Sequence, residues 1–184
     1  QELQGVNLPQ QGEIAPGWYV VSRAAELGTR KPVRVLLNAL PIATFRDANG
    51  QCVAVLDRCA HRNAPLSAGR VVDGRMQCHY HGWEFDGRGA CKHVPGLCGE
   101  PEHATRRVPA FACRESQGWI WVYSQPDVEP DSEPYTIPYA DEPGYLTIRE
   151  HIEMPGPLDA VAENALDVPH TAFVHSGLFR NNRD

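Results

Sequence analysis

The chain has 184 residues, of which 42% are hydrophobic and 22% are charged, and its formal net charge is −6. This length suits one domain, or one domain with part of another, and the acidic balance argues against nucleic-acid binding, which needs a basic face. No apolar run is long enough to span a membrane, and residues 1–17 lack the pattern of a signal peptide. We therefore expect a cytoplasmic protein with neither nucleic-acid nor membrane partners.

The first two-thirds of the sequence alternates short apolar stretches with turn residues. The stretches with β-branched and aromatic side chains are residues 17–21, 33–37 and 118–123. Asn49-Gly50 and Asp73-Gly74 each stand between two such stretches and predict hairpins with two-residue turns. This pattern indicates an antiparallel, mainly β domain over residues 1–123.

Two pairs of cysteine and histidine lie inside this region. Cys59 and His61 form a Cys-x-His pair, and after sixteen intervening residues Cys78 and His81 form a Cys-x-x-His pair. A metal centre, a disulfide scaffold and ordinary core residues are the alternatives, and six cysteines are too few for a disulfide-stapled module of this size. The four other cysteines have no histidine at ligand spacing and are expected to be inert: Cys52, Cys91, Cys98 and Cys113.

The next segment, residues 124–144, contains five prolines and six acidic residues but no lysine or arginine. Proline and repulsion between like charges favour an extended connection, so we predict a linker between two domains. Residues 145–154 alternate as in a strand. Residues 157–178 favour a helix with Pro157 in its first turn, and Pro169 should interrupt that helix.

The C-terminal segment also places an acidic residue and two histidines close together. Asp167 and His170 can share one helical face, whereas His175 lies about 140° further around an ideal helix. The helix must therefore distort if both histidines are to reach one metal ion. Such a run does not identify a site by itself, and the neighbouring Glu163 and Asn164 are weaker candidates.

The two Cys/His pairs resemble the Rieske motif, in which two cysteines hold one iron of a [2Fe–2S] cluster and two histidines hold the other. The stretches CAHRNAPLSAG and CHYHGWEFDGRG are similar to the cluster loops of Rieske non-haem iron oxygenases. Respiratory-type Rieske proteins carry bridging cysteines where this chain has Ala64 and Tyr80. They also carry Ser and Tyr hydroxyls where it has Trp83 and Phe85. Fewer hydrogen bonds to the cluster imply a reduction potential near the low end of the range, roughly −150 mV.

The resemblance also assigns roles further along the chain. It implies that His170 and His175 bind a mononuclear Fe(II) as part of a two-His-one-carboxylate triad. It implies that Asp167 links a cluster-ligating histidine of one subunit to an iron-ligating histidine of its neighbour. The third iron ligand should lie beyond Asp184, so residues 145–184 are expected to be only the beginning of an α+β catalytic domain.

The function implied by the resemblance is that of the oxygenase component of a multicomponent oxygenase. NAD(P)H would supply electrons through a reductase, and possibly a ferredoxin, for hydroxylation, dihydroxylation or oxidative demethylation of a small organic substrate by O2. The family pattern implies a homotrimer. Arg58 and Arg62 flank the first Cys/His pair and either steer an acidic partner or are solvated surface side chains. A non-catalytic Rieske ferredoxin and a zinc-stabilised interaction module are the rival interpretations.

Overall fold

The structure is a computed structural model that describes residues 14–148 and 152–175. The chain divides into two compact units, residues 1–145 and residues 146–184. Among the described residues, the first unit contains strands and three short 3₁₀ turns, and the second contains two helices. The strands are β1 Trp18–Arg23, β2 Val33–Leu37, β3 Leu40–Arg46, β4 Cys52–Leu56, β5 Arg70–Val72, β6 Arg75–Gln77, β7 Glu84–Phe85, β8 Cys91–His93, β9 Ala110–Ser116 and β10 Trp119–Pro126. The expectation of a mainly β, antiparallel fold is confirmed.

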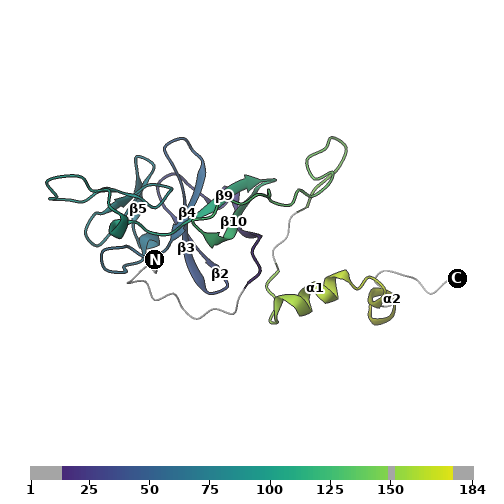
Figure 1. Cartoon of the computed structure of the whole chain (residues 1–184). Helices are drawn as coiled ribbons and strands as arrows, with labels where there is room; N and C mark the ends of the chain where they lie inside the picture. The colour runs from purple at the N-terminus through teal and green to yellow at the C-terminus, as the bar shows by residue number, and fades with distance from the viewer. Residues whose placement is uncertain (1–13, 149–151, 176–184) are drawn as a thin grey trace. The chain divides into compact units, whose positions relative to one another are not determined.

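Six of the strands in the described part of the chain form one antiparallel sheet in the order β1-β10-β9-β4-β3-β2. Figure 1 shows β4 and β9 side by side in this sheet, with β3 on the other side of β4. The remaining strands form a smaller sheet in the order β5-β6-β7-β8. This smaller sheet is inserted in the sequence between β4 and β9, so the residues that include both Cys/His pairs leave the large sheet and return to it.

Strands β3 and β4 each face two hydrophobic cores. Because successive side chains of a strand point to opposite faces, Ile42 packs into the core of the large sheet while Ala43 packs into a second core. The second core contains the fully buried Phe45, Met76 and Phe85, and its members come from both sheets. Burial of side chains of this size contributes about 1.5–3 kcal/mol each. This shared core fixes the small sheet against the large one.

The β5–β6 hairpin has the two-residue turn that its sequence predicts. Asp73 and Gly74 both have positive φ, 49° and 73°, which a type I′ turn requires. The prediction of a two-residue turn at Asn49-Gly50 is wrong, although β3 and β4 do form a hairpin. Five residues, 47–51, connect the last strand pair, Arg46 and Cys52, and within them the Asp47 N–H donates to the Gln51 carbonyl at 2.9 Å.

The side chain of Asp47 explains this longer turn. Its Oδ1 atom accepts hydrogen bonds from the backbone N–H groups of Asn49 and Gln51, each at 2.9 Å. Residues 86–90 form the same turn, in which Asp86 Oδ1 accepts from the N–H groups of Arg88 and Ala90. An aspartate at the first position and a glycine with positive φ at the fourth are therefore the common signal of both turns.

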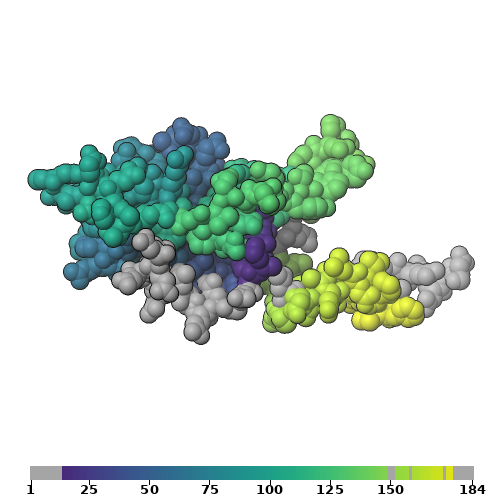
Figure 2. Space-filling model, in the orientation of Figure 1, coloured from purple at the N-terminus to yellow at the C-terminus, as the bar shows by residue number. Residues whose placement is uncertain are grey.

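The segment after β10 has little secondary structure. Tyr135, Tyr139 and Tyr145 are exposed, and the stretch that carries them stands out from the sheets as a light-green projection in Figure 2. The strand predicted over residues 145–154 is absent from its described parts, residues 145–148 and 152–154; residues 149–151 lie outside the described part. A strand needs a partner for its backbone groups, and none pairs with the described residues of this stretch.

The second unit contains helices α1 Leu158–Leu166 and α2 His170–Val174. Pro157 is the N-cap residue of α1, which agrees with its predicted place at the helix start. The interruption expected from Pro169 is confirmed, because α1 ends before it and α2 begins after it. Residues 176–178, at the end of the predicted helix, lie outside the described part.

Candidate metal centre

The first Cys/His pair lies on a tight loop that directly follows β4. The Cys59 N–H donates to the Ala64 carbonyl at 2.9 Å, and the Cys59 carbonyl accepts from the Asn63 N–H at 2.8 Å. Asn63 has a φ of 55°, a conformation that asparagine tolerates better than most side chains. This closed loop buries Cys59 at its base and leaves His61 exposed.

The second pair lies on a loop of the same construction after β6. The Cys78 N–H donates to the Trp83 carbonyl at 2.8 Å, and the Cys78 carbonyl accepts from the Gly82 N–H at 3.0 Å. Gly82 has a φ of 70°, and a Cβ atom there would lie 3.1 Å from the Pro95 ring. Cys78 is buried, whereas His81 is exposed. The two loops thus present the same donors in the same order, although their Cys–His spacings differ by one residue.

The four side chains separate into a buried pair and an exposed pair. Cys59 and Cys78 are each only 2% exposed and belong to the second hydrophobic core. The rings of His61 and His81 have their centroids 4.5 Å apart. The predicted residues are therefore brought together, with sulfur donors on the inner side and imidazole donors on the outer side.

The charge requirements of the buried pair favour a metal cluster. Burial, with the nearby Cys78 sulfur, raises the pKa of the Cys59 thiol to about 12. Such a thiol gives up its proton readily only beside a cation, and a bound metal ion deprotonates a coordinating thiol. Burial lowers the pKa of His61, and the charges of His81 and Arg62 lower it further, which favours the neutral imidazole that coordination needs.

The number of donors also fits a two-iron cluster. A Rieske cluster takes two protein ligands on each iron, because its sulfides complete the coordination. A zinc site takes three or four protein ligands. In the part of the chain that the structure describes, no group of three or more His, Cys, Asp or Glu side chains is placed to hold a single ion. Two cysteines beside two histidines supply the two ligands of each kind that a Rieske cluster takes.

Aromatic rings surround the exposed histidines. Trp83 stacks on His61 with ring centroids 4.7 Å apart and planes inclined by 1°. Tyr80 lies against His81 with centroids 4.0 Å apart. Phe85 is fully buried beneath Trp83 and carries no polar atom, so neither residue offers a hydroxyl group to a cluster.

A buried carboxylate anchors the first loop, and sequence reasoning missed it. Asp57 lies two residues before Cys59 and is 3% exposed. Its oxygens accept hydrogen bonds from the Ser67 N–H at 2.6 Å and the Ser67 hydroxyl at 2.7 Å. The Arg34 guanidinium of β2 lies 3.2 Å from the same carboxylate. Asp57 thus ties the start of the loop to the 3₁₀ turn Leu66–Ala68 that ends it.

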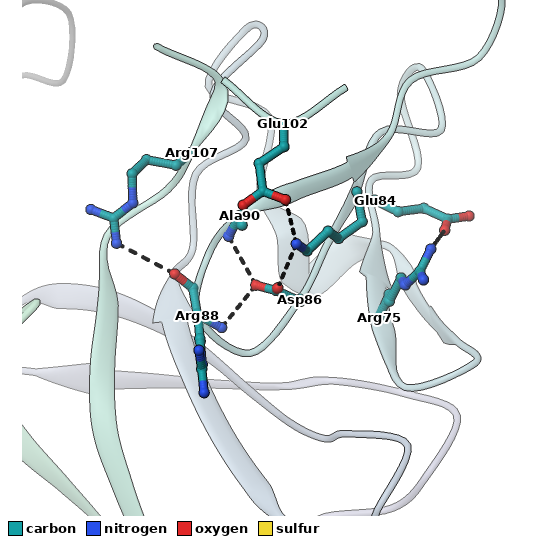
Figure 3. Close-up of polar contacts among 8 residues, drawn as sticks. Arg75, Glu84, Asp86, Arg88, Ala90, Glu102 and Arg107 are labelled. Atoms are coloured by element: carbon teal, nitrogen blue, oxygen red, sulfur yellow. Dashed lines mark hydrogen bonds and ion pairs between the residues drawn. The ribbon is translucent and has the colours of Figure 1, made fainter. Parts of the chain in front are cut away.

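A third loop, residues 94–101, follows β8 and packs on the second cluster loop through Pro95. Its two ends are joined by Lys92, whose ammonium lies 2.5 Å from a Glu102 oxygen and 3.6 Å from an Asp86 oxygen. Figure 3 labels both carboxylates. The same figure shows Asp86 accepting from the backbone of its own turn. This lysine of β8 therefore connects the β7–β8 turn to the segment that follows the third loop.

The second predicted constellation lies at the end of α1, at the start of α2 and just after α2. Asp167 caps the C-terminus of α1, and its Oδ2 atom lies 3.7 Å from His170 Nδ1, which also contacts the Asp167 carbonyl oxygen. His175 follows the last residue of α2 with non-helical backbone angles. The rings of His170 and His175 are 5.5 Å apart. The interruption of the helix at Pro169 and the early end of α2 bring these three residues together. Glu163 and Asn164, like Asp167 and His175, are exposed.

Within the described residues, no helix is long and apolar enough to cross a membrane.

Comparisons with known proteins agree with this geometry. The sequence profile of the Rieske [2Fe-2S] domain family matches residues 17–110. The methylxanthine N1-demethylase NdmA of Pseudomonas putida is 36% identical over 171 residues, which is 87% of this chain and 47% of that protein. The oxygenase component of dicamba O-demethylase from Stenotrophomonas maltophilia is 35% identical over 166 residues, 88% of this chain and 48% of that protein.

Solved structures of Rieske-type relatives also superimpose on this chain. Dicamba monooxygenase bound to dicamba superimposes with a TM-score of 0.76 at 32% identity, over 87% of this chain and 48% of that one. The NdmA structure gives a TM-score of 0.77 at 31% identity, over 90% of this chain and 51% of that one. Chlorophyllide a oxygenase of Chlamydomonas reinhardtii, 36% identical in sequence, is matched over only 24% of its length. The chain thus spans about half or less of the relatives that it matches.

Proposed function

Because the chain belongs to the Rieske [2Fe–2S] domain family, and within it to the oxygenase alpha subunits, we propose that its protein is the oxygenase component of a multicomponent Rieske oxygenase. The observation that carries the proposal is the pair of matching loops that gather two buried thiols and two exposed imidazoles. The names of the relatives, which include demethylases and a chlorophyllide oxygenase, favour oxidative demethylation or hydroxylation of a small organic substrate by O2.

In this proposal the buried and the exposed residues of the cluster loops hold different irons. Cys59 and Cys78 hold one iron in the apolar core, and His61 and His81 hold the other at the surface. A bound Rieske cluster supplies one-electron transfer. The exposed imidazoles, with the exposed Arg62 beside them, form the face at which an acidic reductase or ferredoxin would dock, bringing electrons from NAD(P)H.

The C-terminal unit supplies the second part of the proposal. His170 and His175 would be two ligands of a mononuclear Fe(II), which would supply the oxygen chemistry, and a carboxylate would complete the triad. The carboxylate of Asp167 beside His170 supports its role as the link to a cluster-ligating histidine of a neighbouring subunit. Such a link requires more than one subunit, and we propose a homotrimer. A cytoplasmic location also stays a prediction, which cell fractionation tests.

The test is an inventory of iron, zinc and acid-labile sulfide in the anaerobically purified full-length protein, with an EPR spectrum after dithionite reduction. About three irons per two sulfides with a Rieske-type signal would support the oxygenase. About two irons per two sulfides, unchanged after Fe(II) addition, would leave only an electron carrier. Zinc without sulfide would refute the proposal.

Variants separate the two metal sites. Cys59→Ser should abolish the visible absorbance of the cluster, whereas Cys91→Ser, at a buried cysteine outside the loops, should retain it. His170→Ala should lose the mononuclear iron and keep the cluster spectrum. Asp167→Ala should keep both metals and lose turnover; full activity in that variant would show that Asp167 only caps its helix.

A further inference from the structure

Two cysteines outside the cluster loops face each other across neighbouring strands. In the register of β4 and β9, Ala54 pairs with Phe111 and Val55 with Ala110, so Cys52 continues this pairing opposite Cys113. Residues directly opposite in antiparallel strands have Cα atoms about 4.5–5.5 Å apart, which lies within the range that a disulfide spans. Both cysteines are free thiols, and their side chains are hydrogen-bonded to each other.

The surroundings of this pair suit a reactive dithiol. Each cysteine is 8% exposed, and both line an open cavity of about 480 Å³ that also contains Arg107 and Arg114. The hydrogen bond with Cys113 lowers the pKa of Cys52 despite burial, with help from the charge of Arg46, while the same contact and burial raise the pKa of Cys113. One thiol therefore tends to ionise while the other keeps its proton, as in pairs that undergo thiol oxidation.

We propose that Cys52 and Cys113 are a redox-active cross-strand pair that a peroxide oxidises to a disulfide. The Cys52 thiolate attacks one peroxide oxygen, the O–O bond breaks, and Cys52 becomes a sulfenic acid while one water leaves. The Cys113 sulfur then displaces the sulfenic oxygen as a second water. The two cysteines lose two electrons and two protons in total, and one hydrogen peroxide becomes two waters. A dithiol reductant reverses the step by exchange.

The position of this bond means that it would stabilise the segment that carries the cluster loops. The covalent loop from residue 52 to residue 113 contains all four predicted cluster ligands and the whole small sheet. Cross-linking its two ends restricts the unfolded chain far more than the folded one, in which the two residues already face each other. Oxidation should therefore raise the Tm of the protein by about 10 °C, and reduction should return it to its starting value.

The experiment uses the full-length protein with its metals. Samples are treated with one equivalent of hydrogen peroxide or with the thiol oxidant diamide, alkylated in denaturant and mapped by mass spectrometry without reduction. We expect a peptide pair joined through Cys52 and Cys113, together with a rise in Tm that dithiothreitol reverses. Cys113→Ala should lose both signals, and Cys98→Ala, at an exposed cysteine, should keep both.

Three outcomes would overturn the proposal. The first is alkylation of both Cys52 and Cys113 after a treatment that oxidises Cys98. The second is oxidation of Cys52 to the sulfinic acid without a cross-link, and the third is a cross-link between Cys59 and Cys78 alone, which would report loss of the cluster. The wild-type peptide map decides among these outcomes even if a variant folds poorly, and none of them depends on oxygenase activity.

Discussion

Replacement of Asp57 by alanine tests whether one buried carboxylate holds the first cluster loop. The side chain is 1% exposed, and its oxygens accept two short hydrogen bonds from Ser67, at 2.6 and 2.7 Å. Hydrogen bonds to a charged acceptor contribute about 1.5–3 kcal/mol each. The Arg34 side chain is 56% exposed, so its ion pair adds at most about 1 kcal/mol. We expect Asp57→Ala to lower the free energy of unfolding by about 3–5 kcal/mol.

The assay is urea unfolding followed by tryptophan fluorescence, with all variants compared in the same metal-free state. Ser67→Ala removes only the hydroxyl and should cost about 1.5–3 kcal/mol, because the bond to the backbone N–H remains. Arg34→Ala should cost no more than about 1 kcal/mol. If Asp57→Ala costs no more than Arg34→Ala, the carboxylate does not anchor the loop and the reasoning fails.

Two further predictions concern a close backbone approach and a titrating ion pair. A Cβ atom at Gly69 would lie 2.0 Å from the carbonyl oxygen of Gln77, so Gly69→Ala should lower the free energy of unfolding by about 1–3 kcal/mol. Gly28→Ala is the control, because nothing lies within 4 Å of a Cβ atom at that position. Equal urea midpoints for the two variants would contradict the prediction. Burial raises the pKa of Asp127, but hydrogen bonds from Arg107 and the Ala110 N–H lower it overall. The stability that the ionised Asp127 contributes is therefore fully present above the ordinary aspartate pKa of about 4 and is lost as the pH falls through the lowered pKa. Asp127→Asn should therefore reduce the Tm at neutral pH and flatten its decline below about pH 4, and a decline identical to wild type would refute this.

The cluster loops could be predicted from sequence because their donors lie close together along the chain. Two Cys/His pairs, each followed by a residue that accepts positive φ, define both loops without long-range information. The turn at residues 47–51 is different, since Asn49-Gly50 predicts two residues and the Asp47 side chain imposes five. The aspartate three residues before the glycine was the available signal.

Features that depend on strand register could not be predicted. Cys52 was expected to be an inert core residue, because nothing in its local sequence shows that Cys113 lies opposite. The contact between Asp57 and Ser67 likewise depends on how the first loop folds back. The alternating pattern of residues 145–154 misled for a related reason: alternation describes a strand only where another strand is available to pair with it.

The meeting of Leu56 and Pro109 has a consequence for protein engineering. The Leu56 N–H donates to the Pro109 carbonyl at 2.8 Å, so residues 57–108 leave the large sheet and return to it at one point. An insertion whose two ends touch adds little strain to its host, because almost no loop remains to be closed at the junction. The segment is therefore a transplantable cassette: chimaeras that exchange residues 57–108 between relatives should keep the host sheet while importing the donor's redox properties.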